Sequence, residues 1–122
     1  PDMRLKIDLY RRLSRLSHTK ALNEFATELA DRFGPPPELV TRLLERAELR
    51  ILAHQHGIAS IHIEDRFVVL GYTQRDRIEA VARANNGKLR IVDRQSAYLP
   101  VGKEVINRGE TPGVVKSLLQ RE

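Results

Sequence analysis

The chain has 122 residues, of which 41% are hydrophobic and 30% charged, and its formal net charge at pH 7 is +5. This length fits one domain with a single core, and no stretch reaches the roughly 20 apolar residues of a membrane-spanning helix. The chain has no cysteine, which excludes disulfides, thiolate catalysis and zinc–thiolate sites. We therefore expect a single domain over residues 1–122, and the missing initiator methionine suggests a segment of a longer protein.

The first half of the chain predicts three helices, over about 2–16, 19–33 and 38–56. Asp2 and Thr19 are suitable N-caps for the first two helices. The first helix carries leucines at helical spacing: Leu5, Leu9, Leu13 and Leu16. The third helix follows three prolines and is apolar around a broad arc, which is typical of a central helix with more than one neighbour.

The second helix carries one narrow apolar stripe. Its members recur at helical spacing and are Leu22, Phe25, Ala26, Leu29 and Phe33. Gly34 ends this helix, and the prolines that follow prevent any continuation. We expect the whole stripe to lie in the core, including Phe33.

The second half predicts a small sheet with two helices. The expected strands cover 58–63, 67–70 and 88–92, and the pattern leaves open a further strand at 97–101. Gly71 is expected to close the second strand, and Thr73 with Asp76 resembles a capping box that opens a helix ending at 85–87. A last helix starts at Thr111. The fold class is therefore α+β: an N-terminal three-helix segment, then a small β-sheet with two further helices packed on it.

Motifs for nucleotide binding and catalysis are absent from the sequence. It contains no GxxxxGK[ST] loop, no GxGxxG turn and no GxSxG elbow. His54 and His56 are two residues apart, so they face different sides of a helix and cannot bind one metal as an i, i+4 pair would. We predict that this domain is non-catalytic and has no metal or cofactor of its own.

Three carboxylates on the second helix form the most informative cluster. At 100° per residue, Glu24, Glu28 and Asp31 all fall opposite the apolar stripe. Such a face is either ordinary solvated surface, with Arg32 paired to Glu28, or an acidic docking strip for a basic partner. The pattern alone leaves both readings open.

Three blocks of the sequence resemble a known family. These are RLKIDLYRRLS at 4–14, ELADRFGPPPELV at 28–40 and LLERAELRILAHQHGI at 43–58. They are similar to the C-terminal (TRCF) domain of bacterial transcription-repair coupling factors, and the ELxDRFG block is the most specific. The resemblance covers roughly residues 1–60, and the prolines at 35 and 36 depart slightly from the family pattern.

This resemblance implies a parent protein that is a cytoplasmic, ATP-dependent DNA translocase. Such a parent removes stalled RNA polymerase from damaged DNA in nucleotide excision repair, with ATP and magnesium in a motor elsewhere in its chain. The domain itself would be an autoinhibitory clamp that packs on the parent's UvrB-like module and masks the surface that binds UvrA. The family's docking residues fall on Glu28 and Asp31, with Arg32 adjacent and Glu24 on the same face.

The alternative is a basic accessory domain that binds nucleic acid. It would use arginines of the first helix with two from the second half of the chain: Arg4, Arg11, Arg12, Arg15, Arg75 and Arg83. Residues 1–56 hold 10 Lys and Arg against 8 Asp and Glu, and residues 57–122 hold 11 against 8. Because acids are mixed with the bases in both halves, the charge distribution argues against this alternative, and the resemblance favours docking.

Overall fold

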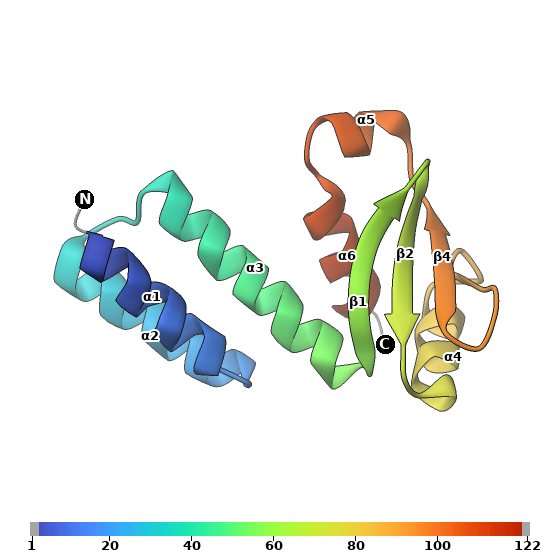
Figure 1. The fold of residues 1–122 in the computed structure, drawn as a ribbon, viewed down its shortest axis with the longest axis horizontal. Helices are drawn as coiled ribbons and strands as arrows, with labels where there is room; N and C mark the ends of the chain where they lie inside the picture. Colours follow the sequence, from blue (N-terminus) through green and yellow to red (C-terminus); the bar gives the residue numbers. More distant parts are fainter. Residues whose placement is uncertain (1–2, 121–122) are drawn as a thin grey trace. The chain divides into compact units, whose positions relative to one another are not determined.

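The computed structural model describes residues 3–120, and it is α+β as predicted (Figure 1). Its residues form two compact units, 1–51 and 52–122, which are taken in turn. Two such units can belong to one domain, so the single domain expected from the sequence stays a prediction. No helix within residues 3–120 is long and apolar enough to cross a membrane.

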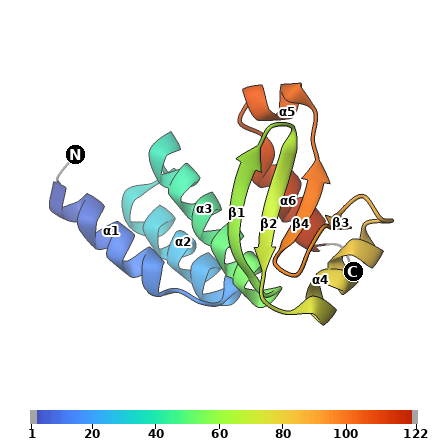
Figure 2. The same ribbon diagram turned by 45° about the vertical axis from the view of Figure 1, so that its right-hand side comes forward.

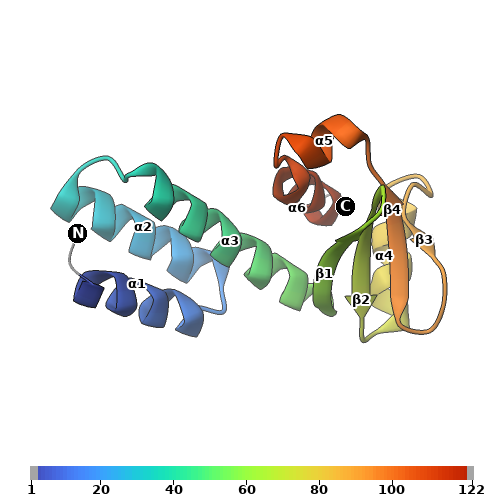
Figure 3. The same ribbon diagram turned by 45° about the horizontal axis from the view of Figure 1, so that its top comes forward.

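The first unit is built from three helices that run side by side (Figure 3). They are α1 (Met3–Arg15), α2 (Thr19–Phe33) and α3 (Glu38–Gln55), the last of which extends into the second unit. All three contribute to one buried cluster: Leu13, Leu22, Phe25, Leu43, Ala47 and Ile51. The three predicted helices are therefore confirmed.

The helix ends of the first unit agree with the sequence in part. Gly34 has φ +77°, a conformation that favours glycine, and its N–H donates to the carbonyl of Ala30 at 2.8 Å, so it ends α2 as predicted. The prediction of Thr19 as N-cap is wrong, because the cap is His18 and it makes no side-chain capping bond. The predicted cap Asp2 and the side chain of Leu5 lie outside the described residues.

Phe33 corrects the predicted core. Its residue is 68% exposed, whereas Leu22 and Phe25 on the same stripe are buried. Phe33 is the last residue of α2, immediately before Gly34 turns the chain. Helical periodicity tells which side of the helix a residue occupies, but not whether a neighbour reaches that far along it.

The second unit contains a four-stranded antiparallel sheet with strand order β1-β2-β4-β3. Its strands are β1 (Ile58–Glu64), β2 (Phe67–Tyr72), β3 (Arg90–Ile91) and β4 (Ser96–Pro100). Asp65, with φ +57°, forms the tight turn between β1 and β2 where the sequence predicts one. Gly71 does not close β2 as expected but lies inside it, where a Cβ would collide with the Ser60 hydroxyl.

Helices α4 (Arg75–Ala84) and α6 (Thr111–Gln120) lie against the same face of this sheet (Figures 1 and 2). The buried Asn85 joins them, since its side-chain amide donates to the carbonyls of Val81 at 2.8 Å and Leu118 at 3.0 Å. The predicted capping box at Thr73 is wrong: Gln74 is the N-cap, and the Thr73 hydroxyl donates to the Gly57 carbonyl.

A short helix, α5 (Lys103–Asn107), was not expected from the sequence. It has five residues, none of them buried. Its length is under two turns, so it offers no apolar period to detect.

Candidate docking surface on the second helix

The acidic residues predicted for docking lie on α2, but they are not equivalent. Glu24 and Asp31 are exposed, and within residues 3–120 neither forms an ion pair or a side-chain hydrogen bond. Their carboxylates keep all their acceptor capacity available for a donor outside the domain. This is the arrangement expected of an unoccupied docking strip and equally of a solvated surface.

Glu28 is held by two arginines. Its carboxylate accepts from the Arg12 guanidinium of α1 at 3.2 Å and lies 4.0 Å from that of Arg32, one turn along α2. The Arg12 guanidinium also lies 4.4 Å from the centre of the Phe25 ring. Glu28 therefore lies at the seam between α1 and α2, with a side chain that is 42% exposed, rather than facing directly away from the core.

The arginines of the nucleic-acid alternative are divided between the two units. Arg12 is engaged with Glu28 and Phe25, and Arg75 pairs with Glu79 at 3.2 Å. Arg4, Arg11, Arg15 and Arg83 are exposed. The ion pairs neutralise part of the charge that this alternative requires, since such binding depends on cations available to phosphates.

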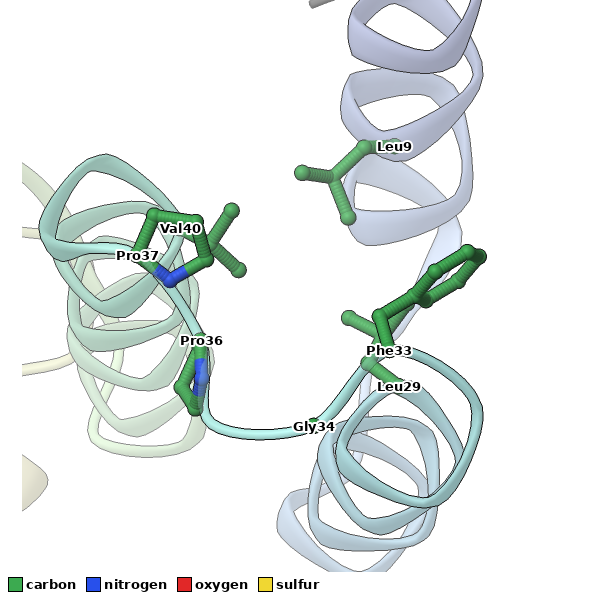
Figure 4. A pocket seen from close by; sticks show the side chains of 7 residues that line it. All are labelled: Leu9, Leu29, Phe33, Gly34, Pro36, Pro37 and Val40. Carbon is green, nitrogen blue, oxygen red and sulfur yellow. The ribbon is translucent and has the colours of Figure 1, made fainter.

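An apolar hollow lies beside this surface, in the first unit (Figure 4). Its volume is about 230 Å³, and it is lined by Leu9 of α1, Leu29 and Phe33 of α2, the turn at Gly34, Pro36 and Pro37, and Val40 of α3. A second hollow of about 380 Å³ shares Leu9, Leu29 and Phe33 with it. Charged residues complete this second hollow: Asp8, Arg11, Arg12, Arg15, Glu28 and Arg32.

Within the described residues, no group of three or more His, Asp or Glu side chains could hold a metal ion. His56 uses its Nδ1 on the Leu52 carbonyl at 2.8 Å, and His62 lies 3.5 Å from the Glu64 carboxylate. These two histidines thus each have a partner within four residues of the sequence.

Two features of this surface were not predicted from the sequence. Arg12 and Glu28 are 16 residues apart, so no local spacing indicates their pairing. The hollow was not predicted because Phe33 was assigned to the core. The run of prolines offered a signal, because proline rings in a turn are apolar and lie outside any helix, and Pro36 and Pro37 line the hollow.

Comparison with known proteins agrees with the resemblance seen in the sequence. A family model described as the TRCF domain matches residues 1–82. The transcription-repair-coupling factor of Helicobacter pylori (strain ATCC 700392 / 26695) is 31% identical over 84 residues, which are 67% of this chain and 8% of that protein. That of Escherichia coli (strain K12) is 28% identical over 78 residues, which are 64% of this chain and 7% of that protein.

The chain thus spans only 7% to 8% of the length of these relatives. The fold also matches a solved structure, the crystal structure of the C-terminal domain of a transcription-repair coupling factor. The TM-score is 0.69 at 18% sequence identity, with 97% of this chain and 80% of that chain covered. The family model matches well over half of the chain, and from this match we conclude that the protein belongs to the TRCF domain family.

Proposed function

We propose that this chain is the non-catalytic regulatory domain of a transcription-repair coupling factor. It docks on the UvrB-like module of its own parent and thereby masks the surface that binds UvrA. The match to the TRCF domain and the transcription-repair-coupling factors among its relatives support this assignment. ATP, magnesium, DNA and RNA polymerase are bound by other parts of the parent.

One observation carries the proposal: two unpaired carboxylates stand on the exposed face of α2. Asp31 and Glu24 have no charged partner within residues 3–120, and Arg32 beside them is itself 68% exposed at its side chain. Arginines of a partner can form short, charge-assisted bonds to such carboxylates without first breaking an existing pair. Docking of this kind is sensitive to salt, because exposed charges are screened over about 10 Å at 0.1 M salt.

Glu28 has a different role in this scheme. Because Arg12 already occupies one of its oxygens, a basic partner must compete with α1 for it. Reversing the charge of Glu28 would therefore disturb the seam between α1 and α2 as well as docking. Asp31 is the cleaner position for a test, since it forms no ion pair or side-chain hydrogen bond within residues 3–120.

The test is calorimetric titration of the 122-residue chain into a purified UvrB-like module at low and at moderate salt. We expect binding that weakens with salt and that Asp31→Lys reduces at least about tenfold, as for a charge reversal at an interface. Glu45→Lys is the matched control, because Glu45 is also exposed, lacks a charged partner in the described part of the chain, and lies on α3.

The same substitution in a full-length coupling factor tests the masking step. Asp31→Lys at the equivalent position should increase the binding of UvrA, measured by pull-down, while Glu45→Lys should not. Unchanged UvrA binding would contradict autoinhibition. If Asp31→Lys left docking unchanged and the chain retarded the migration of a DNA duplex in an electrophoretic assay, the nucleic-acid alternative would be favoured.

A further inference from the structure

The exposed Phe33 lies at the apolar hollow at one end of the three-helix unit. Leu9 and Val40 point from α1 and α3 toward the space next to α2, and the Phe33 ring lies at the rim of this space (Figure 4). The lining contains only apolar side chains and the backbone of the turn. A hollow of this size and composition admits one large apolar side chain, and it has no polar group that would favour water.

The neighbouring hollow is positively charged. Four guanidinium groups and two carboxylates line it, which gives a formal charge of +2. Arg12 and Arg32 share Glu28, whereas Arg11 and Arg15 form no ion pair with any residue within 3–120. Because Leu9, Leu29 and Phe33 line both hollows, the apolar hollow and the basic hollow adjoin, and the two together are called the groove.

We propose that this groove binds an acidic segment of a partner protein, anchored by one Phe or Leu. The anchor enters the apolar end beside Phe33, and carboxylates one or two turns further along meet Arg11 and Arg15. Charge complementarity selects this occupant, because a basic segment would bring its cations against four arginines. An apolar face docked into a groove between helices is a common mode of peptide recognition.

The groove overlaps the acidic strip of the proposed function at Glu28 and Arg32, which line the second hollow, but not at Asp31. Asp31 does not line either hollow, and a basic partner of Asp31 has the opposite charge to the segment inferred for the groove. Each proposal can therefore fail while the other stands. Asp31→Lys is the variant that separates them, since it should leave binding in the groove unchanged.

The experiment uses a panel of fluorescein-labelled helical peptides and the 122-residue chain. Each peptide combines one Phe or Leu anchor with several Glu residues at varied spacing. For each peptide, one control replaces the anchor with Ala and another replaces the Glu residues with Lys. Fluorescence anisotropy at low salt should show binding for peptides that have both the anchor and the acids. We expect Phe33→Ala and Arg11→Glu each to weaken this binding at least about tenfold.

Two matched controls accompany these variants. Leu39→Ala removes another apolar side chain that is 50% exposed but does not line the groove, and Arg46→Glu reverses an exposed cation on α3. Neither should change the affinity. Because Phe33, Arg11 and their controls are all exposed, the variants should fold, and circular dichroism checks that they do.

Three results would overturn the proposal. The first is that no acidic peptide of the panel binds. The second is that binding does not follow the proposed charges: either the Lys peptides bind as well as the Glu peptides, or Asp31→Lys weakens binding as much as Arg11→Glu does. The third is that sedimentation reveals a dimer which Phe33→Ala dissociates, since the groove would then hold a second copy of the chain.

Discussion

At the scale of single residues, Arg50 of α3 bonds to the backbone of α1 and of the residue that follows it. Its guanidinium donates to the carbonyls of Leu13 and Leu16, both at 2.8 Å. Leu13 lies in the last turn of α1, where its carbonyl also accepts from the Leu16 N–H at 3.2 Å, and Leu16 directly follows the helix. The last carbonyls of a helix have no full set of partners within it, so a side chain from elsewhere can bond to them. Arg50 thus caps α1 from a position on α3, 34 to 37 residues away in the sequence.

We predict that Arg50→Ala lowers the free energy of unfolding by about 1 to 2 kcal/mol, because two charge-assisted bonds are lost at partly exposed sites. Urea denaturation followed by circular dichroism measures the change. Arg46→Ala is the control, since Arg46 lies one turn earlier on α3, is exposed, and has no charged partner within the described residues. Equal stability of the two variants would show that the bonds to α1 contribute nothing.

Single residues also show which parts of the core could be predicted from the sequence. The apolar stripe of α2 correctly placed Leu22 and Phe25 in the core, because both lie where α1 and α3 run alongside. Phe33 has the same periodicity and is exposed, because packing at a helix end depends on where the neighbouring helices stop. The end of α2 at Gly34 was predictable, since a left-handed conformation is a local requirement that glycine meets.

At the scale of elements, α1 and α2 are joined on the surface by Arg12. Its guanidinium stacks on the Phe25 ring and pairs with Glu28, so one side chain makes a cation–π contact and an ion pair at once. The two partners of the ion pair are 52% and 42% exposed at their side chains. Water and salt therefore screen most of the attraction between them.

A double-mutant cycle with Arg12→Ala and Glu28→Ala should give a coupling energy below about 1 kcal/mol that falls as salt is raised. Arg12→Ala alone should cost more than Glu28→Ala alone, because it also removes the contact with Phe25. Thermal or urea unfolding of the four proteins provides the measurement. A large coupling energy that is insensitive to salt would contradict this view of the pair.

Pairing between elements explains why the docking surface was only partly predictable. The exposed face of α2 follows from its own period, and Glu24 and Asp31 lie on it as expected. The role of Glu28 depends on a residue of α1 that no local rule associates with it. The joining of α4 to α6 by Asn85 is a similar case, since 33 residues separate the amide from the Leu118 carbonyl that it meets.

At the scale of the whole molecule, the two compact units share one helix. The division falls between Ile51 and Leu52, inside α3, which continues to Gln55. Ile51 belongs to the buried cluster of the first unit, and Leu52 is buried as well. Because α3 is continuous across the division, we expect unfolding of one unit to disturb a helix that the other unit shares.

We predict a single cooperative transition for the 122-residue chain in calorimetry, with equal calorimetric and van't Hoff enthalpies. Ile51→Ala should lower the midpoint of the whole transition, since removing a buried Ile side chain typically costs about 2 to 5 kcal/mol. Two resolved transitions, of which Ile51→Ala shifts only one, would instead divide the chain into two domains.

Strand β1 has a consequence for behaviour at high concentration. It forms one border of the sheet, so within the described residues only one of its sides is hydrogen-bonded, to β2. Its register shifts between Ile58 and Ser60, and exposed His62 and Glu64 stand along it. Irregular pairing and a charged side chain such as that of Glu64 discourage a border strand from recruiting another chain. We therefore expect β1 to pair poorly with strands of other chains, which disfavours growth into larger sheets at high protein concentration.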